Sequence, residues 1–266
     1  MIPAVSQSTT LPAAIPDELE ALGDLGLELW LTKVEQFVTE HSWSELERLL
    51  EQHAPRLVAA SYQGGLWQPD AGARETAWTL FRERLAWCRR LGVPVLVVAG
   101  DLSPLPGGGD VAELVARWRQ AGDLAAAYEI RLAIECRSDA ALANNLLSLG
   151  TLIREADHPS VGWCLDTFHW FVGPSQTEDL AAMPADRLYH VHVSDLLDRP
   201  RELARDADRV LPGDGMVPLE GVIDWLWATE YGGAVSVELF HAIFWELPPV
   251  QVIKAAEAAL ERTCRR

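Results

Sequence analysis

Four polar side chains in this 266-residue chain each stand at the end of an apolar stretch. They are Glu135, Asp166, His192 and Glu238, and successive members lie 31, 26 and 46 residues apart. The stretches before them are rich in Val, Leu, Ile and Ala, as buried strands are. Each spacing fits one strand-to-strand step, so the carboxyl ends of parallel strands would bring the four side chains to one place.

Three carboxylates and an imidazole at one point would repel one another unless a cation lay between them. Oxygen-rich ligand sets suit hard or borderline divalent ions, so we expect one ion of Mn²⁺, Mg²⁺ or Co²⁺, with Zn²⁺ as an alternative. Taken singly, each residue could instead be a helix cap or an ion-pair partner in its own loop. Their repetition on successive strands favours the metal site.

Short β-like runs alternate with longer amphipathic stretches along the whole chain. Eight strands are predicted, over residues 2–6, 26–30, 56–61, 93–99, 131–136, 161–166, 188–194 and 234–239. Helices are predicted over residues 17–23, from 43 onward, and over 73–91, 110–128, 140–156, 178–182, 219–229 and 249–262. This alternation is typical of an α/β fold of the (β/α)8 TIM-barrel type, here as a single domain over residues 1–266.

An open doubly wound sheet is the alternative fold. The dinucleotide-binding form of that fold carries a G-x-G-x-x-G run after an early strand, and this chain has none. Gly107, Gly108 and Gly109 could cradle a phosphate, but no Lys-Ser or Lys-Thr pair follows them. We therefore interpret the three glycines as a turn.

Composition limits the classes of partner. The formal net charge is -17 and 49% of the residues are hydrophobic, which indicates a globular, acidic protein that repels nucleic acid and anionic membranes. The four cysteines form no C-x-x-C pair, as expected of reduced thiols in a cytoplasmic protein. We also expect no signal peptide and no membrane span.

The motifs resemble those of the xylose-isomerase-like TIM barrels, the sugar phosphate isomerase/epimerase superfamily. The resemblance covers nearly the whole chain. It rests on I-E-C at 134–136, L-D-T-F-H at 165–169, H-V-H-V-S-D at 190–195, R-V-L-P-G-D-G at 209–215 and V-E-L at 237–239. It implies that the four strand-end residues are metal ligands and that Glu135 and Glu238 are also the catalytic acid/base pair. It further implies substrate contacts from His169 and Arg209.

Two departures from the epimerase pattern leave the substrate open. Cys136 follows Glu135 where the epimerases have Pro, and an insertion after Asp195 replaces their Glu-x-Asn-Arg run. The resemblance to endonuclease IV is weaker, because that enzyme uses a His-rich three-metal site and this chain has only 7 His. The hydride-shifting xylose isomerases need a catalytic Lys, whereas Lys33 and Lys254 fall in or beside predicted helices.

Together these features predict a divalent-metal-dependent isomerase or epimerase of a small sugar or keto-polyol. A metal ion would polarise the substrate carbonyl, one Glu would remove the neighbouring C–H proton, and the other would return a proton to the enediolate. The alternatives are a metal-dependent dehydratase or lyase on a keto-polyol, and a non-catalytic sugar-binding barrel. We expect a small-molecule sugar or polyol substrate, no nucleic-acid or membrane partner, and leave open whether the chain forms a homo-oligomer.

Other residues near strand ends could complete the pocket. Glu28, in the second strand, could bind a sugar hydroxyl or pair with a basic residue inside the barrel. Trp67, Trp170 and Trp245 follow strands and could stack on the apolar face of a sugar ring. The loop over residues 195–218 is rich in Arg and Asp, so it could be a lid or a self-paired surface loop.

Overall fold

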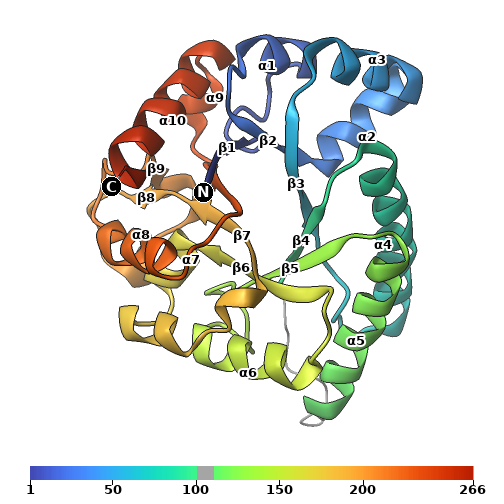
Figure 1. Ribbon diagram of the computed structural model, residues 1–266, viewed down its shortest axis with the longest axis vertical. Helices are drawn as coiled ribbons and strands as arrows, with labels where there is room; N and C mark the ends of the chain where they lie inside the picture. Colours follow the sequence, from blue (N-terminus) through green and yellow to red (C-terminus); the bar gives the residue numbers. More distant parts are fainter. Residues whose placement is uncertain (101–110, 266) are drawn as a thin grey trace.

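The computed structural model describes residues 1–100 and 111–265 of the chain. The three glycines at 107–109 lie outside these residues. Eight parallel strands form a closed barrel in the order β1-β10-β7-β6-β5-β4-β3-β2, so the predicted TIM barrel is confirmed (Figure 1). The barrel strands are β1 Ile2–Ser6, β2 Gly26–Trp30, β3 Arg56–Gln63, β4 Val95–Ala99, β5 Arg131–Glu135, β6 Val161–Asp166, β7 Leu188–Val193 and β10 Ala234–Val237.

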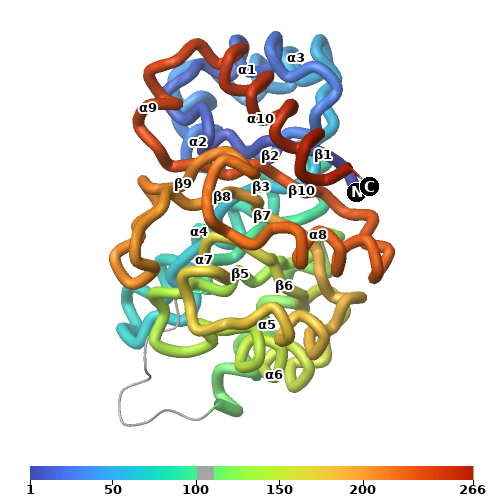
Figure 2. The backbone as a smooth tube through the Cα atoms, turned by 90° about the vertical axis from the view of Figure 1, so that its left-hand side faces the viewer, coloured from blue at the N-terminus to red at the C-terminus, as the bar shows by residue number. Residues whose placement is uncertain are grey.

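Helices surround the barrel on its outside (Figure 1). They are α1 Ile15–Ala21, α2 Leu31–Glu40, α3 Trp43–His53, α4 Ala71–Leu91, α5 Val111–Ala127, α6 Leu146–Ala156, α7 Thr167–Val172, α8 Leu219–Ala228, α9 Ala242–Trp245 and α10 Pro249–Cys264. Short 3-10 turns occupy Thr177–Ala182, Ala185–Arg187, Arg201–Leu203 and Asp206–Asp208. Figure 2 shows α10 beside α1, so the last helix packs against the first and completes the outer layer.

Side-chain caps set the first residue of several helices. The Ser42 hydroxyl accepts a hydrogen bond from the Glu45 amide at 3.1 Å and starts α3, as the sequence predicts. The Asn145 side chain caps α6 in the same way, so this helix begins at Leu146 and not at residue 140. Helix α2 was not predicted, although Leu31 and Val34 are buried at helical spacing within it.

Two apolar layers hold the barrel together. Small or β-branched side chains such as Ala59, Val97 and Ala133 fill the barrel interior. Larger side chains such as Phe81 and Trp118 fill the layer between strands and helices, where both are fully buried. Because the barrel interior is packed, we expect a substrate to bind at a barrel mouth. None of the helices in the described ranges is long and apolar enough to cross a membrane.

The segment between β7 and α8 folds back on itself. It contains a two-residue antiparallel pair, β8 Asp195–Leu196 with β9 Arg209–Val210. The buried Asp195 carboxylate accepts hydrogen bonds from the amides of Leu196 and Val217 at 2.8 Å and of Gly213 at 3.1 Å. Arg199 pairs with Asp208 nearer the surface. Much of this loop is thus self-paired, while Arg209 is turned inward.

A substitution at Gly162 tests how closely β6 packs against the segment that leads into β7. A Cβ atom at this position would lie 2.2 Å from the Arg187 carbonyl oxygen and 2.5 Å from the Tyr189 ring. Because backbone cannot yield locally, Gly162→Ala should lower the free energy of unfolding by about 1–3 kcal/mol, measured by urea titration. Gly232→Ala, with no atom within 4 Å, is the control. Equal stability of the two variants would contradict this packing.

Candidate active site

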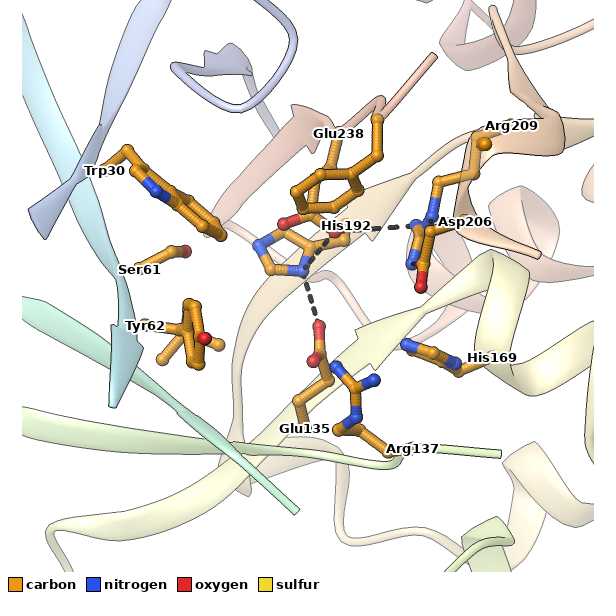
Figure 3. A pocket seen from close by; sticks show the side chains of 13 residues that line it. Trp30, Ser61, Tyr62, Glu135, Arg137, His169, His192, Asp206, Arg209 and Glu238 are labelled. Atoms are coloured by element: carbon orange, nitrogen blue, oxygen red, sulfur yellow. Dashed lines mark hydrogen bonds and ion pairs between the residues drawn. The ribbon is translucent and has the colours of Figure 1, made fainter. Parts of the chain in front are cut away.

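A cavity of about 390 Å³ opens at the carboxyl ends of the barrel strands, where the sequence places the chemistry. Its lining combines acidic, basic and aromatic side chains from most of the barrel (Figure 3). The lining residues are Trp30, Ser61, Tyr62, Val97, Glu135, Arg137, His169, His192, Asp206, Ala207, Arg209, Glu238 and Phe240.

The four strand-end residues meet around one nitrogen atom at the floor of this cavity. His192 Nδ1 lies 2.8 Å from Glu135 Oε1, 3.4 Å from Glu238 Oε2 and 3.9 Å from Asp166 Oδ2. All four donor atoms lie within 4.8 Å of one another, and all four residues are buried. Glu135 and Glu238 approach the imidazole from two sides (Figure 3).

This donor set fits a divalent cation. Ligands that share a metal at about 2.0–2.2 Å stand roughly 3–4 Å apart, close to the 2.8, 3.4 and 3.9 Å that separate the carboxylate oxygens from His192 Nδ1. Three carboxylates also crowd one buried volume. Burial, together with the charges of Glu135 and Asp166, raises the pKa of Glu238 well above its usual value despite the attraction of His192 and Arg209. A bound cation would relieve this repulsion.

Asp166 is held on both of its oxygens. Oδ1 accepts hydrogen bonds from the amides of Phe168 and His169 at 2.7 and 3.1 Å, which caps α7. Oδ2 accepts from Arg209 Nη1 at 2.9 Å. Burial disfavours the charged carboxylate, but Arg209, His169 and His192 together hold the pKa of Asp166 below its usual range. The carboxylate is therefore ionised and fixed in direction.

Arg209 lies between two aromatic rings as well as beside carboxylates. Its guanidinium carbon is 4.4 Å from the centre of the Phe168 ring and 5.6 Å from that of Phe240. Nη2 lies 2.9 Å from Asp206 Oδ1, and Nη1 lies 3.4 Å from Glu238 Oε2. Arg209 lines the cavity, and it also neutralises part of the acidic cluster.

Glu28 does not line the cavity, which corrects the expectation that it binds substrate. The side chain is fully buried below His192, with Oε1 2.9 Å from His192 Nε2 and Oε2 3.0 Å from His190 Nε2. The Ser61 hydroxyl also donates to Glu28. Glu28 therefore pairs with basic residues inside the barrel, His190 and His192, which was the alternative left open by the sequence.

The Glu28 contact fixes the orientation of His192. A carboxylate on one ring nitrogen makes that nitrogen the donor and leaves the other free to bind a metal. Here Nε2 faces Glu28, so Nδ1 faces the acidic cluster. Burial raises the energy of the charged carboxylate, but His192 and His190 outweigh it and hold the pKa of Glu28 well below its usual value.

Trp67 and Trp170 also differ from expectation. Both are buried and neither lines the cavity: the Trp67 ring packs 5.7 Å from that of Trp118, and Trp170 Nε1 donates to the Gln176 carbonyl oxygen at 3.3 Å. The large apolar area of each ring is buried more completely under the helices than at an open mouth. Trp245 Nε1 donates to the Ser8 carbonyl oxygen at 2.9 Å.

Different aromatic side chains form a wall of the cavity. The Trp30 ring lies 5.1 Å from the Tyr62 ring and 5.6 Å from the Phe240 ring, and all three line the space. Trp30 and Phe240 each follow an inward-facing glutamate by two residues. The period of two along a strand was the signal that could have identified them.

Arg137 was missed for the same reason, since it follows Glu135 by two residues. Its Nε and Nη2 each lie 3.1 Å from an Asp139 oxygen. His169 lines the cavity beside it (Figure 3), with Nδ1 3.1 Å from the Ser138 hydroxyl. Burial lowers the pKa of His169, which favours the neutral imidazole at this position.

A family model described as the xylose isomerase-like TIM barrel matches residues 16–263 of the chain. The chain belongs to this family. The fold is that of the crystal structure of an IOLI protein with a bound zinc atom, with a TM-score of 0.90 over 99% of this chain and 98% of that one at 21% identity. A D-psicose 3-epimerase from Clostridium cellulolyticum, solved with D-tagatose, gives 0.76 at 18% identity over 100% of both chains.

Curated relatives of this family member carry two kinds of name. An inosose isomerase of Halalkalibacterium halodurans is 24% identical over 234 residues, which are 85% of this chain and 82% of that protein. A 3-dehydroshikimate dehydratase of Pseudomonas putida is 30% identical over 146 residues, which are 54% of this chain and only 23% of that larger protein. Both are similar to this chain at a level that leaves the reaction open.

Metal add-back tests the cluster directly. Protein stripped with a chelator should bind about one divalent ion per chain, and Mn²⁺ or Zn²⁺ at 100 times the dissociation constant should stabilise it by about 2.7 kcal/mol. Elemental analysis and thermal melting measure the two effects. His192→Gln should lose both, because His192 Nδ1 contacts every carboxylate of the cluster. Glu51→Gln, an exposed carboxylate in α3, should retain both.

Glu28→Gln tests the orientation of His192. The variant loses the carboxylate that holds Nε2, so metal affinity should fall about 10–100-fold in isothermal titration. Glu18→Gln is a matched control, because Glu18 is an equally buried carboxylate that pairs with Lys33 at 2.7 Å, away from the cluster. If the two variants bind the ion equally well, Glu28 does not position His192.

Proposed function

We propose that this protein is a divalent-metal-dependent isomerase or epimerase of a small sugar or keto-polyol. The observation that carries the proposal is the placement of Glu135 and Glu238. Both line the same cavity, and they reach the same imidazole nitrogen from different strands, at 2.8 and 3.4 Å. The two carboxyl groups can therefore lie near the same substrate carbon.

The ion would be held by Glu135, Asp166, His192 and Glu238. When bound, a divalent ion polarises a substrate carbonyl and makes the neighbouring C–H bond more acidic. Asp166 and His192 are fixed by Arg209 and Glu28, as described above, so their donor atoms need little rearrangement on binding. This preorganisation supports the assignment of Asp166 and His192 as ligands that hold the ion and do not transfer protons.

The two glutamates would move the protons. A carboxylate oxygen of one takes the proton from the carbon beside the carbonyl. A carboxyl group of the other delivers a proton to the opposite face of that carbon, which epimerises it, or to the adjacent carbon, which isomerises the substrate. Each member of the pair is hydrogen-bonded or ion-paired to His192, which keeps both carboxyl groups directed at the cavity floor.

The remaining lining residues would bind and orient the substrate. His169 and Arg209 face the cavity from its polar side, and Arg137 lies beside them (Figure 3). Trp30, Tyr62 and Phe240 form an aromatic side, which can cover the C–H face of a sugar ring and exclude water from the reacting carbon. This polar and aromatic division supports a polyhydroxylated substrate.

The relatives support the same chemical class and offer a second candidate. Inosose isomerases match most of this chain, and inososes are cyclic keto-polyols. The matches to 3-dehydroshikimate dehydratases favour a dehydratase as the alternative. A dehydratase begins with the same C–H proton removal but then loses a hydroxyl group, so the two candidates differ only in the second proton step.

Hydrogen exchange in D₂O tests the proposal and separates the candidates. The metal-loaded protein is incubated with an inosose, with D-psicose or D-tagatose, and with 3-dehydroshikimate, and NMR follows deuterium uptake beside the carbonyl. We expect exchange with rearrangement of a keto-polyol. Loss of water would identify the dehydratase, whereas binding without exchange would contradict both and leave the sugar-binding barrel.

The catalytic roles are tested by Glu135→Gln and Glu238→Gln. Each removes one proton-transfer group, so turnover of the substrate found should fall by about 10²–10⁴. Circular dichroism and thermal melting check that the variants fold. Glu246→Gln is the control. Glu246 is an exposed carboxylate that lies, like Glu238, between β10 and α10, and it does not line the cavity. Unchanged turnover in either variant would contradict its role.

A further inference from the structure

Cys164 lies level with Glu135 on the neighbouring strand. The sequence places Cys164 one layer below the strand-end residues, because it precedes Asp166 by two positions. The strands of the barrel are staggered, however, and the register pairs Glu135 with Cys164 and Asp166 with His192. The stagger brings the thiol up beside the acidic cluster.

The thiol is placed as a ligand would be. Cys164 Sγ lies 3.7 Å from His192 Nδ1, the nitrogen that faces the cluster. Donor atoms of Glu135, Cys164 and His192 all lie within 4.8 Å of one another, and all three residues are buried. Sulfur at about 2.3 Å and nitrogen at about 2.0–2.1 Å from one tetrahedral ion stand roughly 3.5 Å apart, close to the observed separation.

Asp166, the proposed ligand on the same strand as Cys164, shares its negative charge with Arg209. Asp166 Oδ2 lies 2.9 Å from Arg209 Nη1, and Oδ1 accepts two backbone hydrogen bonds. The guanidinium offsets part of the Asp166 charge, so an ion held by Asp166 still gains from a further anionic donor nearby. Among the described residues, Cys164 Sγ contacts His192 Nδ1 and no guanidinium. The cluster therefore contains two overlapping ligand sets, which share Glu135 and His192.

We propose that Cys164 is a metal ligand and that it makes the site selective for Zn²⁺ or Co²⁺ over Mg²⁺ and Mn²⁺. This inference rests on the metal site of the proposed function. Thiolate sulfur favours zinc, whereas carboxylate oxygen alone suits magnesium and manganese. Binding forms a bond from Cys164 Sγ to the ion and releases the thiol proton to solvent. Glu135 and His192 complete the softer set.

Cobalt absorption tests the sulfur ligand without an activity assay. Chelator-treated protein receives one equivalent of Co²⁺, and a thiolate ligand then gives a charge-transfer band in the near ultraviolet. We expect this band in the unmodified protein and in Cys136→Ser, and its loss in Cys164→Ser and Cys164→Ala. Cys136 is the matched control, because it is also buried and its Sγ contacts the Ala143 carbonyl oxygen at 3.3 Å.

The possible failures are distinguishable. Cobalt bound with only ligand-field bands would overturn the role of Cys164 while keeping the metal site. Failure to bind any divalent ion would overturn both the role and the proposed function. X-ray absorption of the zinc-loaded, unmodified protein avoids any folding defect of the variants: a sulfur scatterer at about 2.3 Å supports the proposal, and a shell of only oxygen and nitrogen contradicts it.

Competition between ions measures the selectivity. Cys164→Ser should lower the preference for Zn²⁺ over Mn²⁺ by at least about tenfold in equilibrium dialysis, because an oxygen donor replaces sulfur. Cys136→Ser should leave the preference unchanged. An unchanged ratio in Cys164→Ser would show that the thiol does not select the ion.

Discussion

The crowding of buried carboxylates around one imidazole is the constraint on which the rest of this structure depends. Glu28, Glu135, Asp166 and Glu238 are all at least nine-tenths buried, and each has an oxygen within 4 Å of a His192 ring nitrogen. Burying unpaired charges costs several kcal/mol each, so each carboxylate must have a partner. The partners found here are His190, His192, Arg209 and backbone amides, and they set the direction of every side chain in the cluster.

His192 connects the inner and outer parts of this network. Its Nε2 meets Glu28 inside the barrel, and its Nδ1 meets the cluster at the cavity floor. The inner contact therefore fixes which nitrogen is presented to an ion. Arg209 plays the corresponding part on the other side, where its contacts with Asp166 and Asp206 bring the long β7–α8 connection over the cavity. The loop takes part in the site through Asp206, Ala207 and the buried Arg209, while Arg199 is paired at the surface.

The barrel explains why the cavity has two unlike sides. Inward-facing residues recur at every second position, so Glu28, Glu135 and Glu238 are followed two residues later by Trp30, Arg137 and Phe240 at the rim. Strands β2, β3 and β10 contribute or lead into the aromatic side, and strands β5, β6 and β7 with the loops after them contribute the polar side. An acidic cluster beneath an aromatic wall suits a substrate with several hydroxyl groups and an apolar ring face.

The fold class, the approximate positions of the eight strands and the four residues of the cluster could be predicted from the sequence alone. Apolar runs with one polar end are a local signal, and parallel strands with short connections leave few alternatives to a barrel. The height of each residue along the barrel axis could be read only from the folded structure. The stagger between strands is a long-range property, and it placed Cys164 beside Glu135 and Glu28 beneath His192. Burial likewise decided which tryptophans pack and which line the cavity: Trp30 ends β2 and Trp67 follows β3, and the folded helices cover Trp67 but leave Trp30 at the cavity.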